Sequence, residues 1–178
     1  MGRPKALVRD PDGTSWLLSA VRALSEGGCS SVVVVLGAQA DQAVSLLAGA
    51  DRSGPPVHWV EAPEWAEGMG ASLRRGLEAA QDTDASTAVV TLVDLPDVGA
   101  DVVQRVVAAV GNDPSSLGRA AYQGSPGHPV VLGRDHWSGV AAEAAGDRGA
   151  RDYLAAHDVL LVECGDLASG LDVDVTPD

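Results

Sequence analysis

Short runs of valine and other apolar residues alternate along this chain with segments of helical periodicity. The run Val32-Val33-Val34-Val35 is continuous, which is typical of a strand buried on both faces of a parallel sheet. We predict strands over residues 31–36, 57–60, 88–93, 129–132 and 159–163, and a short strand that ends at Tyr122. We predict helices over residues 15–25, 40–48, 71–80, 100–110, 137–145 and 148–157. This order predicts a three-layer α/β domain with a mostly parallel sheet.

The composition limits what the core and the surface can be. Hydrophobic residues make up 46% of the chain, but aromatic residues only 3%, so Val, Leu and Ala must fill the core. The net charge is −13, and no basic face is visible, which argues against a nucleic-acid partner. An acidic protein that binds a polyphosphate needs a divalent cation between the like charges. The acidity also has a simpler explanation in solubility.

The cysteines and the lengths of the apolar runs indicate in which cellular compartment the protein works. Cys29 and Cys164 lie far apart and form no C-x-x-C motif, so we expect buried free thiols in a reducing cytosol. No apolar run reaches the roughly 18 residues that span a bilayer, and no segment resembles a signal peptide. We therefore expect a cytoplasmic protein without a membrane partner.

Asp94 directly follows the predicted strand over residues 88–93 and precedes Leu95-Pro96. In open α/β sheets, ligands bind beyond the carboxyl ends of the strands. A carboxylate at such a position suits Mg²⁺, which prefers oxygen ligands. The alternative is an aspartate that caps the following turn.

Four further segments carry candidate site residues, each with a structural alternative. Asp172 and Asp174 alternate with valines, so they lie on one side of a predicted strand, or in an exposed acidic tail. Gly68 and Gly70 open a helix that contains Ser72, which suits an anion or is only a flexible loop. The third segment is a predicted tight turn at residues 124–129, which contains Gly127 and His128. The fourth contains Arg148 and Arg151, which either reach a phosphate or pair with surface carboxylates.

These segments together resemble a known signature. The matching stretches, in chain order, are M-G-x-P-K-A-L from Met1, G-M-x-x-S-L from Gly68, D-x-P from Asp94, G-H-P from Gly127, G-D-x-G-A-R from Gly146 and D-x-D-x-T-P from Asp172. Their order and spacing are similar to those of the molybdenum cofactor nucleotidyltransferases, and to the cytidylyltransferase-like branch in particular. Val175 stands as an apparent insertion in the last motif, so either Asp172 or Asp174 fills the second aspartate position of the family.

The resemblance implies a Rossmann-like nucleotidyltransferase. In such an enzyme a phosphate of an acceptor attacks the α-phosphorus of a nucleoside triphosphate, CTP rather than GTP, and pyrophosphate leaves. The resemblance suggests a molybdopterin-like acceptor, although another phosphorylated acceptor is an alternative. The implied roles are a Mg²⁺ site at Asp94 with Asp174 or Asp172, catalysis by Lys5 and Asp94, nucleotide binding by Gly2, Arg3, Lys5, Gly68 and Ser72, and acceptor binding by Gly127, His128 and Arg148.

The same signature normally begins with a strand and a Gly-rich loop ahead of the M-G-x-P-K-A-L segment. Such a loop lets backbone N–H groups close around phosphate oxygens, because glycine has no Cβ to block the approach. We therefore expect residues 1–178 to form a single nucleotidyltransferase-like domain, truncated at its N-terminus. The alternative is a catalytically silent domain that binds a partner or an acceptor.

Overall fold

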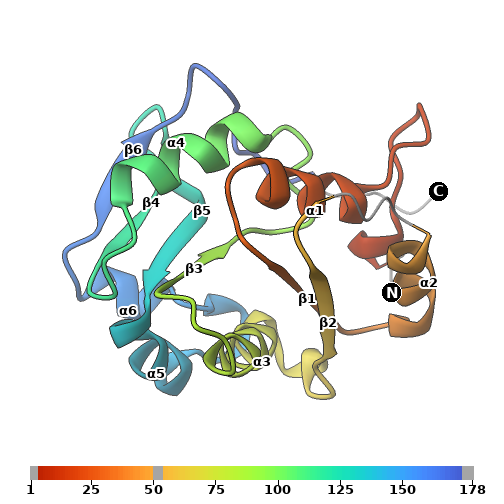
Figure 1. The fold of residues 1–178 in the computed structure, drawn as a ribbon, viewed down its shortest axis with the longest axis horizontal. Coiled ribbons are helices and arrows are strands. Elements are labelled where there is room, and N and C mark those ends of the chain that lie inside the picture. Colours follow the sequence, from red (N-terminus) through yellow and green to blue (C-terminus); the bar gives the residue numbers. More distant parts are fainter. Residues whose placement is uncertain (1–3, 50–53, 174–178) are drawn as a thin grey trace.

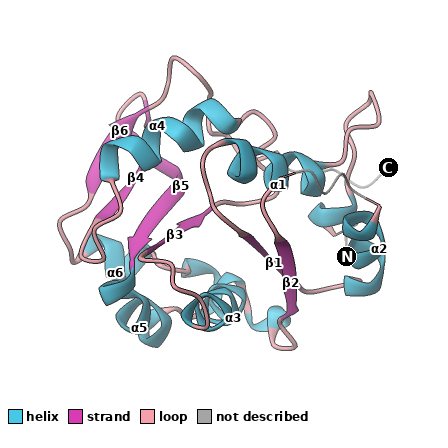
Figure 2. Cartoon of the chain, in the orientation of Figure 1, coloured by secondary structure: helices cyan, strands magenta, loops and turns pink. Residues whose placement is uncertain are grey.

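The computed structural model describes residues 4–49 and 54–173, in which helices and strands alternate as predicted (Figures 1 and 2). The α-helices are α1 (Trp16–Glu26), α2 (Ala40–Ala48), α3 (Met69–Gln81), α4 (Ala100–Val110), α5 (Arg134–Glu143) and α6 (Arg151–Ala155). The strands are β1 (Val32–Leu36), β2 (Val57–Glu61), β3 (Thr87–Val90), β4 (Leu117–Tyr122), β5 (Ser125–Gly133) and β6 (Leu160–Glu163). Short 3-10 turns occur at η1 (Lys5–Leu7), η2 (Trp65–Glu67) and η3 (Gly146–Arg148).

The described strands form two sheets. β1 pairs with β2 in parallel, and the other sheet has the order β3-β5-β4-β6. In that sheet β4 and β6 are parallel, whereas β5 runs antiparallel to both of its neighbours. The predicted α/β class with parallel pairing is confirmed, and β5 adds an antiparallel strand at the centre of the larger sheet.

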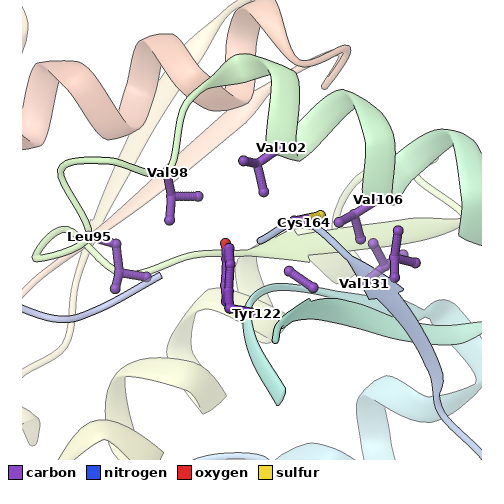
Figure 3. Close-up of a cluster of buried hydrophobic side chains, with 9 residues drawn as sticks. Leu95, Val98, Val102, Val106, Tyr122, Val131 and Cys164 are labelled. Carbon is purple, nitrogen blue, oxygen red and sulfur yellow. The ribbon is translucent and has the colours of Figure 1, made fainter. Parts of the chain in front are cut away.

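Helices cover both faces of the larger sheet, which gives the three predicted layers. On one face α4 packs its Val102 and Val106 against Val131 of β5 and Val162 of β6 (Figure 3). On the other face, α3, α5 and α6 meet the sheet in a cluster that contains Leu77, Leu117, Val130, Leu132, Trp137, Val140, Tyr153 and Leu154. β1 has its own cluster with α1, α2 and η1, which contains Leu7, Leu17, Val32, Val34, Leu36 and Ala43.

Local sequence explains where the helices begin and how they approach each other. Ser15 has extended backbone, and its side chain accepts a hydrogen bond from the N–H of Leu18 at the start of α1, as an N-cap serine does. Gly27 follows α1 and touches α4, where a Cβ would lie 2.4 Å from Cγ1 of Val103. A glycine at this position therefore lets α1 and α4 pack closely.

Two predicted segments differ from the structure near the candidate site. β3 ends at Val90 rather than Val93, so Asp94 lies in a loop beyond the strand. The tight turn predicted for residues 124–129 is wrong in extent, because Gln123 and Gly124, both with positive φ, already reverse the chain. The carboxylate of Glu163 accepts hydrogen bonds from both of their N–H groups. β5 therefore begins at Ser125 and includes Gly127 and His128.

Candidate active site

The loop after β3 brings Asp94 to the N-terminal lysine and to the C-terminal segment. Lys5 Nζ lies 3.3 Å from Oδ2 of Asp94 and donates a hydrogen bond of 2.7 Å to the carbonyl of Val173. The N–H of Val173 in turn donates to the carbonyl of Asp94, at 3.0 Å. Three segments that are far apart in the sequence therefore meet here.

The Lys5–Asp94 pair remains within reach of a ligand. The two side chains are 31% and 21% exposed, and a partly exposed ion pair contributes little to stability. Asp172 adjoins Val173 in the chain, so it lies close to this group. The strand predicted around Asp172 is not formed in the described residues 171–173. Three of the predicted residues, Gly2, Arg3 and Asp174, lie outside the described residues.

A bulge in β5 shapes the neighbouring part of the site. The pairing with β4 jumps from Arg119↔Val130 to Ala121↔Pro126, so residues 127–129 lie outside the regular ladder. Bulges of this kind redirect side chains and are common next to active sites. The carbonyl of the bulged Gly127 accepts a hydrogen bond from Nε of Arg119 at 3.0 Å.

His128, in this bulge, is held as a neutral imidazole. Burial lowers its pKa to about 4, and the positive charge of Arg119 acts in the same direction, whereas the Asp94 carboxylate partly opposes them. A neutral imidazole can both donate and accept a hydrogen bond. His128 therefore stands within the electrostatic reach of Asp94, on the side of the site that the resemblance assigns to the acceptor.

Tyr122 connects the bulge with the C-terminal segment. Its hydroxyl donates a hydrogen bond of 2.6 Å to the carbonyl of His128. Its ring lies between two glycines, since a Cβ on Gly127 would come within 2.6 Å of it and one on Gly170 within 2.1 Å. Figure 3 shows this ring among the buried side chains below α4. The sequence predicted Tyr122 only as the end of a short strand, because its contacts with Gly127 and Gly170 depend on the folded structure.

The predicted nucleotide-binding glycines form a second group. Gly68 has φ 114° and precedes α3, where a Cβ would lie 2.5 Å from the carbonyl carbon of Gly146. Gly70 is as close to the backbone of Ala145, at 2.7 Å. The G-M-x-x-S-L and G-D-x-G-A-R motifs are therefore in direct contact. Ser72 is half-buried in the first turn of α3.

In the described part of the chain, the group at Gly68 and Ser72 makes no direct polar contact with the group at Lys5 and Asp94. Within the described ranges, no hydrogen bond or ion pair joins Gly68 or Ser72 to Lys5 or Asp94. Arg148 is 66% exposed and pairs with Asp152, and among the described residues no hydrogen bond or ion pair joins it to Gly127 or His128. In the same part of the chain, no three His, Cys, Asp or Glu side chains gather closely enough to hold a metal ion.

Known proteins show the same domain. A model of the MobA-like NTP transferase domain matches residues 1–160. The chain belongs to the MobA-like NTP transferase family. This membership confirms the predicted resemblance and the prediction of a nucleotidyltransferase. Within the described residues, none of the helices is both long and apolar enough to cross a membrane.

Relatives of this family member cover nearly all of it. Nicotine blue oxidoreductase of Paenarthrobacter nicotinovorans is 36% identical over 98% of this chain and 85% of its own length. The manganese complex of Rv0371c from Mycobacterium tuberculosis has a TM-score of 0.70 and 26% identity over 98% of this chain and 88% of that one. An Rv0371c homologue from Mycobacterium sp. strain JC1 has a TM-score of 0.72 and 25% identity, over 98% and 83% of the two chains.

Proposed function

We propose that this MobA-like NTP transferase joins a nucleoside monophosphate, from CTP in preference to GTP, to a phosphorylated small molecule such as a molybdopterin. An oxygen of the acceptor phosphate attacks the α-phosphorus, a new P–O bond forms, and the bond to the leaving pyrophosphate breaks. Such a reaction depends on positioning and charge neutralisation more than on a protein nucleophile. The observation that carries the proposal is the convergence of Lys5, Asp94 and the segment at Val173.

The carboxylates in this group fit a divalent cation. Asp94, with Asp172 or Asp174, would hold Mg²⁺ or Mn²⁺, because both ions prefer oxygen ligands. The similar Rv0371c structure is a complex with manganese, which supports a divalent ion here without deciding between the two. A bound cation would neutralise charge on the triphosphate. Lys5, 3.3 Å from Asp94, would add a second positive charge to the same phosphates.

The other predicted residues have roles that follow from their placement. Gly68 precedes α3 and Ser72 lies in its first turn, so both would approach the nucleotide where a helix N-terminus favours an anion. Gly127 and the neutral His128 would face the acceptor. Arg148 is engaged with Asp152, so a contact with the acceptor would require that ion pair to open.

Pyrophosphate release tests the proposal. The purified protein is incubated with CTP or GTP, with Mg²⁺ or Mn²⁺, and with a panel of phosphorylated acceptors. We expect release with CTP that requires both a divalent cation and an acceptor. Binding of nucleotide without release under every combination would favour the alternative of a silent binding module.

An oxidoreductase is the second candidate function. The supporting observation is the name of the 36% identical relative, nicotine blue oxidoreductase. The test is bleaching of nicotine blue by this protein with a reduced nicotinamide nucleotide as the two-electron donor. Bleaching without pyrophosphate release would favour this candidate over nucleotidyl transfer.

A further inference from the structure

Arg119 has an unusual place for a charged residue. It lies within β4, between β5 and β6, opposite Val130 on one side and Leu161 on the other. Ala120 and Tyr122 pack toward α4, whereas Leu117 packs toward α3, α5 and α6. Because side chains alternate along a strand, Arg119 extends toward the same face as Leu117. It therefore extends to the face covered by α3, α5 and α6.

Among the described residues, no counter-charge accompanies this guanidinium. Its Nε donates to the carbonyl of Gly127, and within residues 4–49 and 54–173 no carboxylate lies within 4.0 Å of it. The chain has 25 acidic residues, and other arginines do use them, as Arg105 pairs with Asp166 and Arg148 with Asp152. Arg119 is half-buried, and burying a charged group even in part is costly unless an opposite charge accompanies it.

The charged neighbour of Arg119 is another arginine. Arg151 begins α6, is exposed, and in the described part of the chain also has no carboxylate partner. Burial lowers the pKa of Arg119, and the like charge of Arg151 adds to this effect. Two cations thus lie within electrostatic reach of each other in a protein with a net charge of −13. An anion between them would compensate the burial and the repulsion together.

We propose that Arg119 and Arg151 bind the phosphate group of the acceptor substrate. The proposal rests on the proposed function and adds a site to it. Since Gly127 holds Nε of Arg119, the two Nη groups are left to donate in parallel to phosphate oxygens, which a planar guanidinium does well. Arg151, on exposed backbone at the start of α6, can close over the same phosphate from the solvent side.

The position favours the acceptor phosphate over the triphosphate. Lys5 and Asp94, proposed for the triphosphate and its cation, are tied to the segment at Val173. Arg119 instead contacts Gly127, which adjoins His128 in the part of the site that the resemblance assigns to the acceptor. In nucleotidyl transfer the incoming phosphate and the leaving pyrophosphate lie on opposite sides of the α-phosphorus, so the acceptor phosphate needs a cationic site separate from that of the triphosphate.

Titration of the whole chain with inorganic phosphate, and separately with Mg–CTP, tests this site. Binding is followed by the Nε–H signals of the arginines in ¹H–¹⁵N spectra. We expect phosphate to shift the Arg119 signal, and R119Q to weaken phosphate binding about tenfold, as the loss of a charge-assisted hydrogen bond does. R151Q should weaken it less. R22Q is the matched control, because Arg22 is exposed on α1, and it should leave phosphate affinity within about twofold of wild type.

Each outcome decides a different point. Unchanged phosphate affinity in R119Q, or an equal loss in R22Q, would overturn the site. A loss of Mg–CTP binding with phosphate binding intact would assign Arg119 to the triphosphate and overturn the acceptor assignment. If melting shows that R119Q is unfolded, R119K decides, since it keeps the charge but loses the parallel donors and should still weaken phosphate binding. These titrations measure binding and need no turnover, so they still test the phosphate site if the protein fails to transfer a nucleotide.

Discussion

At the scale of single residues, Asp94 is the side chain on which the proposed nucleotidyl transfer depends most. It contacts Lys5 through its side chain and Val173 through its backbone, so its charge and its shape have separable roles. Asp94→Asn keeps the shape and removes the charge that a divalent cation requires. We expect turnover to fall ~10²-fold or more, on the scale of losing one strong electrostatic contact to a transition state.

Pyrophosphate release and thermal melting on one preparation of Asp94→Asn measure both effects. Asp41→Asn, which removes the same charge from the exposed surface of α2, should leave turnover unchanged. Activity of Asp94→Asn within about threefold of wild type would make Asp94 a turn-capping residue. A loss of turnover with an unchanged melting temperature supports the role in cation binding.

His128 makes a prediction about pH. Its pKa is about 4 in the folded chain, against an ordinary value of 6.5. Between these values the unfolded chain binds a proton that the folded chain does not, so stability rises with pH across this window. Below about pH 4 both states are protonated and the contribution of His128 no longer changes. Denaturant unfolding from about pH 4 to about pH 7 should therefore show a smaller pH dependence in His128→Asn than in wild type, and an identical dependence would contradict this account.

At the scale of elements, the C-terminal segment is positioned by Tyr122. Gly170 has φ 64°, and a Cβ there would lie 2.1 Å from the Tyr122 ring. Gly170→Ala should therefore lower the free energy of unfolding by about 1–3 kcal/mol and should also reduce turnover, because residues 171–173 would shift away from Lys5 and Asp94. Chemical denaturation measures the first effect and pyrophosphate release the second.

Gly111→Ala is the control for this prediction. Gly111 ends α4 with a φ of 76°, and a Cβ there would meet nothing within 4 Å. The Gly111→Ala variant therefore reports the effect of backbone strain alone. If both variants lose the same stability and keep full turnover, the contact of Gly170 with Tyr122 does not position the site.

Most helices, and the position of Asp94 beyond the end of a strand, could be predicted from the sequence. The helices over residues 40–48 and 100–110 have the predicted bounds, because their apolar periodicity and flanking glycines are local signals. The bulge at residues 127–129 was not predictable, since it depends on the register of β5 with β4. For the same reason Arg119 was missed: its lack of a carboxylate partner depends on the folded structure, and a lone arginine in a strand has no distinctive pattern.

At the scale of the whole molecule, the charge of −13 governs how a triphosphate can approach. Free CTP carries negative charge and is repelled by the acidic surface, whereas bound Mg²⁺ offsets part of that charge and can bridge the phosphates to the carboxylates of the protein. We expect calorimetry to show weak CTP binding that depends strongly on Mg²⁺. Tight binding of CTP in EDTA would contradict the requirement for a bridging cation.

The central claim is that this family member transfers a nucleotide to a phosphorylated acceptor at the Lys5–Asp94 site. The most direct test supplies CTP labelled at the α-phosphate, Mg²⁺ and a molybdopterin-type acceptor to wild type and to Asp94→Asn. The account predicts that label appears in the acceptor together with an equal amount of pyrophosphate, and that Asp94→Asn abolishes both. Label that remains in CTP with every phosphorylated acceptor, or transfer that survives in Asp94→Asn, would contradict it.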